Sequence, residues 1–346
     1  MDTKRVLIAM SGGVDSAVTA HLLIQQGYAC KGATMLLCGN EDTAGAEAIC
    51  RLLGMEFEAY DCREAFRQEV ITPFVESYEE GKTPNPCIFC NEKLKFGVLY
   101  EIALREGFDY LATGHYARIR EEDGRRVLCK AADEKKDQSY VLYGLTREQL
   151  ARVLFPLGEY TKEQIRAIAE EKGFSNAKKG DSQDICFIPD GDHAGFIRRF
   201  TGKEYPTGAF VDLQGRVMGS HKGIICYTVG QRKGLGLALP EPYYVCRKDG
   251  ESNRVVLCTA SELPVDRLWV EQFVFTGGEE EKEPFRATVR TRYHQKEQPV
   301  TVVPMGDGRV MLVFDAPVCV AAPGQSAVVY RGDTVIGGGR ICGETV

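Results

Sequence analysis

Residues 5–16, RVLIAMSGGVDS, place a short apolar run directly before a glycine pair and a group of small polar residues. The apolar run has the length and composition of a buried strand. Residues 15–27 continue with apolar side chains at helical spacing and end on a glycine, which predicts a helix. Glycines between a strand and a helix let the backbone approach a ligand closely, and the helix N-terminus offers free N–H groups. Residues 11–16 are therefore predicted to cradle phosphate groups.

The alternation of strand and helix continues outward from this loop through the first half of the chain. Further strands are expected at 30–37, 56–61 and 109–114, with helices at 43–54, 63–81, 91–107, 146–155 and 161–173 and a hairpin at 117–131. This order is typical of an α/β fold in which helices cover both faces of a doubly wound parallel sheet.

The pattern changes near residue 200, where glycines and short β-like runs take over. After Trp269 the runs alternate and are separated by turn signals, which predicts a small antiparallel β-barrel. We therefore expect three domains: an α/β domain at 1–200, a small β-rich central domain at 201–265 and the barrel at 266–346.

Composition limits the classes to which the protein can belong. The chain has 346 residues, a net charge of −6 and no apolar run of transmembrane length. Its 13 cysteines are odd in number and scattered, as expected of a cytoplasmic protein without structural disulfides. The acidic total argues against nucleic-acid binding, although basic residues cluster locally at 115–120, 197–203 and 286–296.

The glycine loop differs from the two commonest nucleotide-binding motifs. It lacks the GxxxxGK[ST] lysine of the Walker loop, and it is not a GxGxxG turn. The hexapeptide SGGVDS (11–16) instead resembles the PP-loop of the ATP pyrophosphatases. That resemblance implies ATP binding and release of pyrophosphate while a substrate is adenylated. On this basis, replacing Asp15 with alanine should abolish pyrophosphate release and leave the fold intact.

Two stretches contain cysteines in unusual surroundings: TPNPCIFCN (83–91) and the polar segment GDSQDICFIP (180–189). The spacing of Cys87 and Cys90 alone is compatible with half of a metal site, a redox pair, or a nucleophile with a neighbour. A thioredoxin-like pair is disfavoured, because the two cysteines are expected in a proline-rich loop and not at the start of a helix.

Six motifs together resemble the tRNA-specific 2-thiouridylases, in the order of that family and over almost the whole chain. They are TPNPCIFCN (83–91), ATGHYAR (112–118), KKDQSYVLY (135–143), GDSQDICFI (180–188), YTVGQRKGLG (227–236) and APGQSAVVY (322–330). The resemblance implies that ATP and Mg²⁺ adenylate the C2 oxygen of the wobble uridine of tRNA. Sulfur from a cysteine persulfide then gives 2-thiouridine and releases AMP.

The same resemblance assigns residues to roles. Cys90 matches the nucleophile and Cys186 the cysteine that receives persulfide sulfur, the two being able to form a disulfide, with Lys93 or Lys95 lowering the thiol pKa. The ATP-binding positions are Ala9, Met10, Ser11, Gly12, Gly13, Val14, Asp15, Ser16, Met35 and Gly114. Asn85, Pro86 and Cys87 match positions that face the target base. The tRNA-contact positions are His115, Lys136, Asp137, Gln138, Arg292, Tyr293 and Gln325.

The implied partners are the wobble-uridine tRNAs for Lys, Glu and Gln and a sulfur-donor or sulfur-relay protein, with no membrane. Cys87 departs from the family pattern, because many members have aspartate there. Cys87, Cys90 and Cys186 could instead hold three corners of a [4Fe–4S] cluster. Two other functions stay open: a PP-loop synthetase acting on a small acid, and a non-catalytic RNA-binding protein with structural zinc.

Overall fold

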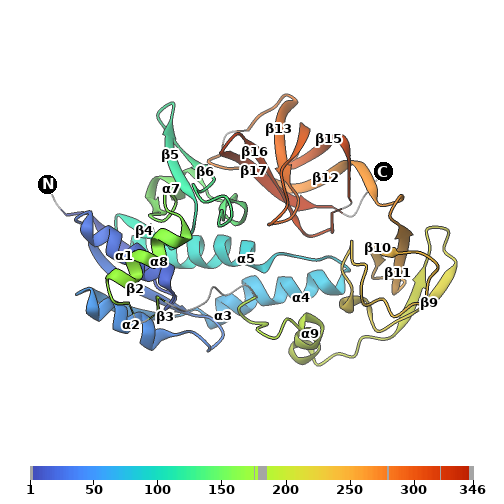
Figure 1. The fold of residues 1–346 in the computed structure, drawn as a ribbon, viewed down its shortest axis with the longest axis horizontal. Helices are drawn as coiled ribbons and strands as arrows, with labels where there is room; N and C mark the ends of the chain where they lie inside the picture. Colours follow the sequence, from blue (N-terminus) through green and yellow to red (C-terminus); the bar gives the residue numbers. More distant parts are fainter. Residues whose placement is uncertain (1–2, 175, 178–184, 279, 320, 343–346) are drawn as a thin grey trace.

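The computed structural model describes residues 3–174, 176–177, 185–278, 280–319 and 321–342. Its strands form a parallel sheet from the first half of the chain, a small mixed sheet from the middle and an antiparallel sheet that is mostly C-terminal. In Figure 1 the parallel sheet and its helices lie at the N-terminal end, and the C-terminal barrel lies above helices α4 and α5. Within the described residues, no helix is both long and apolar enough to span a bilayer.

The parallel sheet has the strand order β3-β2-β1-β4-β7. The strands are β1 (Arg5–Ala9), β2 (Ala29–Leu36), β3 (Glu56–Asp61), β4 (Tyr110–Ala112) and β7 (Val153–Leu154). Val6, Leu7 and Ile8 of the central strand are fully buried, which accounts for the continuous apolar run in the sequence. Since successive strands are added on opposite sides of β1, the carboxyl ends of β1 and β4 border the switch point where such sheets bind ligands.

The helices of this region connect the strands and lead to the cysteines. They are α1 (Val14–Gln25), α2 (Thr43–Leu52), α3 (Arg63–Phe66), α4 (Thr72–Glu79), α5 (Pro86–Phe89), α6 (Leu99–Arg105), α7 (Arg147–Arg152) and α8 (Lys162–Glu171). Two π-helical segments, Arg67–Ile71 and Cys90–Val98, link α3 to α4 and α5 to α6. The helices expected at 63–81 and 91–107 are thus long helical stretches that contain π segments.

The middle of the chain begins with α9 (His193–Thr201). It then forms a four-stranded sheet in the order β10-β11-β8-β9. The strands are β8 (Gly208–Val211), β9 (Val217–His221), β10 (Tyr243–Asp249) and β11 (Arg254–Thr259). Short 3₁₀ turns lie at Ile224–Cys226 here and at Ser139–Val141 in the first half of the chain.

The C-terminal strands close into a six-stranded antiparallel barrel, because β12 pairs with both β15 and β17. The strands are β12 (Pro264–Phe275), β13 (Phe285–Arg290), β14 (Gln298–Gly306), β15 (Arg309–Cys319), β16 (Ser326–Arg331) and β17 (Thr334–Ile341). Alternate side chains such as Val300, Val302 and Leu312 fill the interior with no exposed area. The predicted α/β fold with a C-terminal barrel is confirmed, while the domain boundaries remain predictions.

The hairpin of β5 (Arg118–Glu122) and β6 (Arg125–Cys129) belongs to the barrel's sheet and not to the parallel sheet. It turns at Asp123 and Gly124, as expected, and both have a positive φ. Thr334 of β17 pairs with Cys129 of β6, so the first half of the chain extends the sheet of the C-terminal barrel. This pairing joins the barrel to the first half of the chain.

Candidate active site

The glycine loop joins β1 to α1 at the switch point of the parallel sheet. Gly12 has a φ of +70°, and a Cβ there would lie 2.8 Å from the backbone oxygen of Asp42. Gly13 is the N-cap of α1, and no side chain caps the helix. The N–H groups of the first turn are therefore available to an anion. This arrangement is the phosphate cradle that the sequence predicted.

The two serines of the loop brace it from inside. The Ser16 hydroxyl donates to the Gly13 carbonyl at 3.0 Å and accepts from the Ser11 N–H at 3.3 Å. The Gly13 N–H lies 3.4 Å from the Ser11 hydroxyl. These bonds fix the conformation of the loop.

Asp15 is held by a lysine that the sequence analysis did not identify. Lys162 Nζ lies 2.8 and 2.9 Å from the two carboxylate oxygens of Asp15, and the Tyr116 hydroxyl donates to the same carboxylate at 2.8 Å. The Lys162 side chain is only 6% exposed. Removing the carboxylate alone would leave a buried ammonium without this partner, so we now expect Asp15→Ala to destabilise the fold as well as to abolish pyrophosphate release.

The other predicted ATP positions line the same edge. Gly114 follows β4, and a Cβ there would lie 3.1 Å from Asp15 and Ser16, so a glycine is needed for the two loops to touch. Met10 and Met35 are buried behind the loop, while Ala9 is partly buried. Met10 is fixed between strands by its N–H, which donates to Ala33 O at 2.8 Å.

Cys87 and Cys90 lie at the start of a helix. Asn85 is the N-cap of α5 and its side chain accepts the Cys87 N–H at 3.1 Å, with Pro86 in the first turn. The expectation that the pair sits in a proline-rich loop is therefore wrong. The prolines instead start the helix, and Cys90 begins the π-helical segment, a geometry that recurs at functional sites.

Cys186 lies beside the predicted nucleophile. Burial raises the pKa of the Cys186 thiol to about 12, and the thiols of Cys90, Cys38 and Cys87 add to the effect. Their mutual influence places all four sulfurs in one neighbourhood, so the structure brings together Cys90 and Cys186. Cys38, which follows β2, was missed because no motif surrounds it in the sequence.

The cation of this neighbourhood is Lys95. Burial raises the pKa of the Cys90 and Cys87 thiols, and the ammonium of Lys95 acts in the opposite direction on both. Lys93 instead pairs with Glu92 at 2.8 Å on the surface. Of the two lysines that the sequence offered, Lys95 is the one placed to favour thiolates.

The side chain of His115 lies next to that of Lys95. Its Nε2 lies 3.5 Å from Lys95 Nζ and its Nδ1 lies 2.7 Å from the Thr113 hydroxyl. Burial, with a smaller contribution from Lys95, holds the pKa of His115 well below its usual value, so the ring is neutral at pH 7. Because the His115 ring is buried, it is poorly placed to contact RNA in this conformation. Its contact with tRNA stays a prediction.

The remaining tRNA positions differ in accessibility. Arg292 is exposed and lies against Gly230, and Lys136 is half-buried. Asp137 is buried and accepts from Arg290 at 2.7 Å. Gln138 accepts the Tyr116 N–H at 2.9 Å. Of these four, Arg292 is the side chain most available to a phosphate.

Tyr293 and Gln325 connect the barrel to the cysteine helix. Burial raises the pKa of Tyr293 to about 12, with contributions from Asp137 and Cys87, which places its hydroxyl near Cys87. Gln325 Nε2 donates to Thr83 O at 2.7 Å, and the Thr83 N–H donates to Pro323 O at the same distance. The C-terminal region therefore borders the site, and the Gln325 amide holds the loop of residues 83–86 in place through this hydrogen bond.

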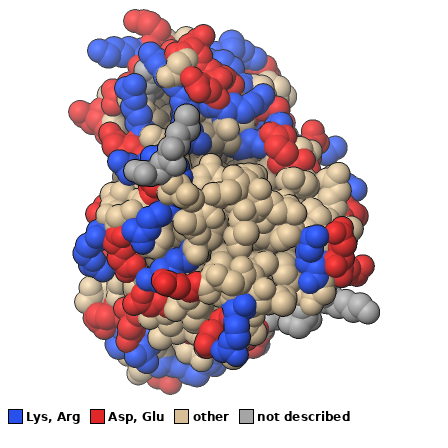
Figure 2. All heavy atoms as spheres, turned by 90° about the vertical axis from the view of Figure 1, so that its left-hand side faces the viewer, with Lys and Arg blue, Asp and Glu red and all other residues tan. Residues whose placement is uncertain are grey.

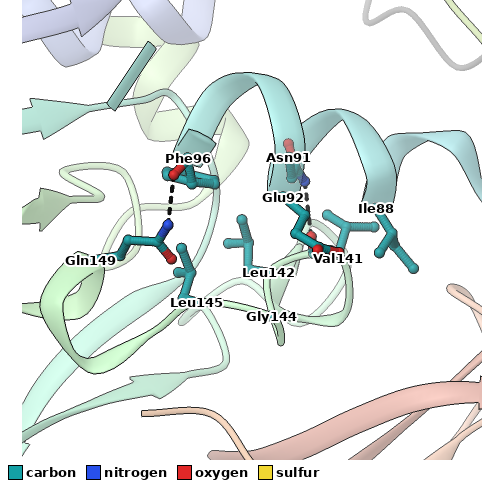
Figure 3. A pocket seen from close by; sticks show the side chains of 9 residues that line it. All are labelled: Ile88, Asn91, Glu92, Phe96, Val141, Leu142, Gly144, Leu145 and Gln149. Carbon is teal, nitrogen blue, oxygen red and sulfur yellow. Dashed lines mark hydrogen bonds between the residues drawn. The ribbon is translucent and has the colours of Figure 1, made fainter. Parts of the chain in front are cut away.

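A small cavity lies on the other side of the cysteine helix (Figure 3). Asn91 donates to Val141 O at 2.9 Å and Gln149 donates to Phe96 O at 2.6 Å, so two side-chain amides clamp the π-helical segment to residues 141–149. The Asn91 carbonyl oxygen is buried without a partner among the described residues. The cavity is too small for a substrate and marks how the helix is held.

The described residues contain no group of three or more histidine, cysteine or acidic side chains placed to hold a metal ion. A [4Fe–4S] cluster on Cys87, Cys90 and Cys186 stays a prediction. On the face drawn in Figure 2, acidic and basic side chains are interspersed around a wide uncharged area, so this face offers no continuous basic surface to RNA.

Three family models match the chain in succession. Residues 4–190 match the tRNA methyl transferase HUP domain, 194–259 the tRNA methyl transferase PRC-barrel domain and 265–341 the aminomethyltransferase beta-barrel domain. Among solved structures the likeness is weaker: a 4-thiouridine synthetase–RNA complex with bound ATP has a TM-score of 0.36 and 16% identity, covering 57% of this chain and 50% of that chain.

Curated relatives match from end to end. The tRNA-specific 2-thiouridylase MnmA of Carboxydothermus hydrogenoformans is 45% identical, covering 98% of this chain and 97% of that protein. The enzymes of the same name from Syntrophotalea carbinolica and Acetivibrio thermocellus are 46% and 43% identical, covering 98% and 99% of this chain and 98% and 100% of their own lengths. The chain belongs to the family of tRNA-specific 2-thiouridylases.

Proposed function

We propose that the protein replaces the C2 oxygen of the wobble uridine of tRNA with sulfur, at the expense of ATP. One observation carries this proposal: a short chain of contacts joins the glycine cradle to the cysteines. Gly114 packs on the cradle, the neighbouring His115 ring lies 3.5 Å from Lys95, and Lys95 acts on the thiols of Cys87, Cys90 and Cys186. A carbonyl oxygen is a poor leaving group, so a phosphate cradle beside sulfur nucleophiles suits adenylation followed by displacement.

In the first step, the free N–H groups of α1 and the exposed Ser11 hydroxyl hold the ATP phosphates, while the buried Ser16 hydroxyl supports the loop. Mg²⁺ would be bound by these phosphates, because both Asp15 carboxylate oxygens are already paired with Lys162, and it would neutralise the charge on pyrophosphate as it departs. The uridine C2 oxygen attacks the α-phosphorus, the bond to pyrophosphate breaks, and the oxygen becomes part of an adenylate.

In the second step, Cys186 carries a persulfide received from a sulfur-donor or sulfur-relay protein. The terminal sulfur attacks C2, AMP leaves, and the uridine is joined to Cys186 through two sulfurs. The Cys90 thiolate then attacks the Cys186 sulfur, which releases 2-thiouridine and leaves a Cys90–Cys186 disulfide. Lys95 favours the thiolate that this attack needs.

The substrates proposed are the tRNAs for Lys, Glu and Gln, with Asn85, Pro86 and Cys87 bordering the target base. Asn85 and Cys87 are accessible to it, whereas Pro86 is buried and would act by shaping the loop. Cys87 has no assigned step in this route.

The test is mass spectrometry of nucleosides from tRNA of cells lacking the protein, with the same cells complemented by wild type or by Cys186→Ser. Loss of 2-thiouridine that only the wild type restores is expected. Unchanged 2-thiouridine would reject the proposal in favour of a small-molecule PP-loop synthetase. Restoration of activity to anaerobic protein only by iron and sulfide would reject the persulfide route and support the cluster.

A further inference from the structure

The cation next to the glycine cradle comes from another helix. Residues 11–16 lack the lysine that a Walker loop carries. Lys162 lies in the first turn of α8, which packs beside α1 (Figure 1), and its ammonium reaches Asp15 from 147 positions further along the chain. Because the Lys162 side chain is only 6% exposed, the fold itself places this charge at the cradle.

Three hydrogen bonds fix the start of α8. The Thr161 hydroxyl accepts the Gln164 N–H at 3.3 Å, and the Gln164 side chain accepts the Thr161 N–H at 2.7 Å, which together form a capping box. The Lys162 N–H donates to the Asp133 carboxylate at 3.2 Å. The backbone from which the Lys162 side chain projects is therefore held by the protein's own contacts.

The position of Asp15 in α1 explains why a cation is needed there. An acidic side chain in the first turn of a helix is attracted to the free N–H groups of that turn, where it competes with a bound anion. Here both carboxylate oxygens accept from Lys162, at 2.8 and 2.9 Å, and one of them also accepts from the Tyr116 hydroxyl at 2.8 Å. Within the described residues no side chain caps α1, so these N–H groups stay open to phosphate.

We infer that Lys162 is a positioning residue for ATP, which neutralises the Asp15 carboxylate and keeps it from the N–H groups of the cradle. This inference rests on the ATP-dependent function proposed above, and it assigns no contact between Lys162 and the nucleotide. Without the ammonium, the Asp15 carboxylate repels the triphosphate and competes with it for the N–H groups. The repulsion is electrostatic, so it weakens as salt screens the charges.

The experiment measures ATP binding to the full chain by calorimetry, with Mg²⁺ present, at low and at high salt. Lys162→Met, which keeps most of the side-chain length without the charge, should bind ATP about tenfold more weakly at low salt, and the loss should shrink at high salt. The variant Asp15→Asn/Lys162→Met, which has neither charge, should bind ATP at least about fivefold more tightly than Lys162→Met. Circular dichroism of each sample verifies that the protein is folded, so a lower affinity reports on the cradle.

The matched control is a lysine at the other end of the same helix. Lys172 is the C-cap of α8 and pairs with Glu171 at 2.8 Å, so Lys172→Met should bind ATP as the wild type does. Equal affinities of Lys162→Met and the wild type would overturn the inference. A double variant as weak as Lys162→Met would also overturn it, because the ammonium would then act on the phosphates directly. A wild type that binds ATP neither alone nor with tRNA would instead reject the proposed function.

Discussion

At the scale of single residues, the charges around the cysteines decide which thiol can react. Burial raises the pKa of Cys90, so little thiolate exists at neutral pH, and Lys95 is the cation that acts against this. From the sequence alone, both Lys93 and Lys95 were candidates for lowering the thiol pKa. The choice depends on a helix geometry that turns Lys95 inward toward His115 and leaves Lys93 with Glu92.

The first prediction concerns these two lysines. Lys95→Met should raise the pKa of Cys90 further and slow its alkylation by iodoacetamide at pH 7.5, about tenfold for each unit of pKa. Lys93→Met, which removes a charge of the same sign two positions away, should leave the rate unchanged. Alkylation at Cys90 is followed by mass spectrometry of the peptide. Equal rates in both variants would show that Lys95 does not control the thiol.

The second prediction concerns the ion pair of Asp15 and Lys162. Asp15→Ala should abolish pyrophosphate release and also lower the free energy of unfolding by about 1–3 kcal/mol, less than for a fully buried pair because Asp15 is partly exposed. In the double variant Asp15→Ala/Lys162→Met the stability should recover while pyrophosphate release stays absent. Denaturant unfolding and a pyrophosphate assay separate the two effects. Normal stability of the single variant would contradict a structural role for the pair.

At the scale of elements, the sequence predicted the strands and helices of the first half well but not their partners. The strand expected at 56–61 has those bounds in the structure, because its composition and flanking turns are local signals. The pairing of β6 with β17 joins Cys129 to Thr334, and no local pattern names a partner so far along the chain. Likewise, the carbonyl of Phe96 in the π-helical segment accepts from the Gln149 amide, which comes from a separate helix.

The third prediction tests the junction between the hairpin and the barrel. Burial opposes the charge of Glu297, but Lys130, Thr288 and Arg290 overcome it and hold its pKa below the ordinary value. A carboxylate with a lowered folded pKa stabilises the fold above its unfolded pKa, near 4.3, and the stabilisation is lost as the pH falls through the folded pKa. The thermal stability of the wild type should therefore decrease as the pH falls below about 4.3. Glu297→Gln should be less stable at pH 7 and less dependent on pH in this window, whereas the exposed Glu204→Gln should behave as wild type. A parallel pH dependence of wild type and Glu297→Gln would contradict this linkage.

At the scale of the whole molecule, the barrel and the catalytic region act as one surface. The C-terminal region supplies Tyr293, whose ring packs against Tyr140, and its 323–325 segment is hydrogen-bonded to Thr83 just before the cysteine helix. RNA that contacts the barrel would thus lie across the opening to the cysteines. The sequence indicated RNA as a partner only through the family resemblance, because the overall charge of −6 hides where basic side chains gather.

The last prediction concerns how tRNA is held at this scale. Arg292 is exposed on the barrel and lies against Gly230 of the middle region, so a phosphate bound there would be held where two parts of the chain meet. If Arg292 and Lys136 each neutralise one phosphate, the slope of log affinity against log salt should fall by roughly one for each alanine substitution. Affinity for a tRNA transcript is measured by filter binding between 50 and 200 mM salt, about the range over which such slopes are resolved. The matched control is Lys282→Ala, which removes an exposed lysine from an acidic segment and should not change the slope.

Because Asp137 is paired with Arg290 inside the protein, Asp137→Asn should destabilise the fold without altering the slope of the salt dependence. An unchanged slope in the Arg292→Ala/Lys136→Ala protein would remove both side chains from the interface and direct the search for it to the other basic clusters.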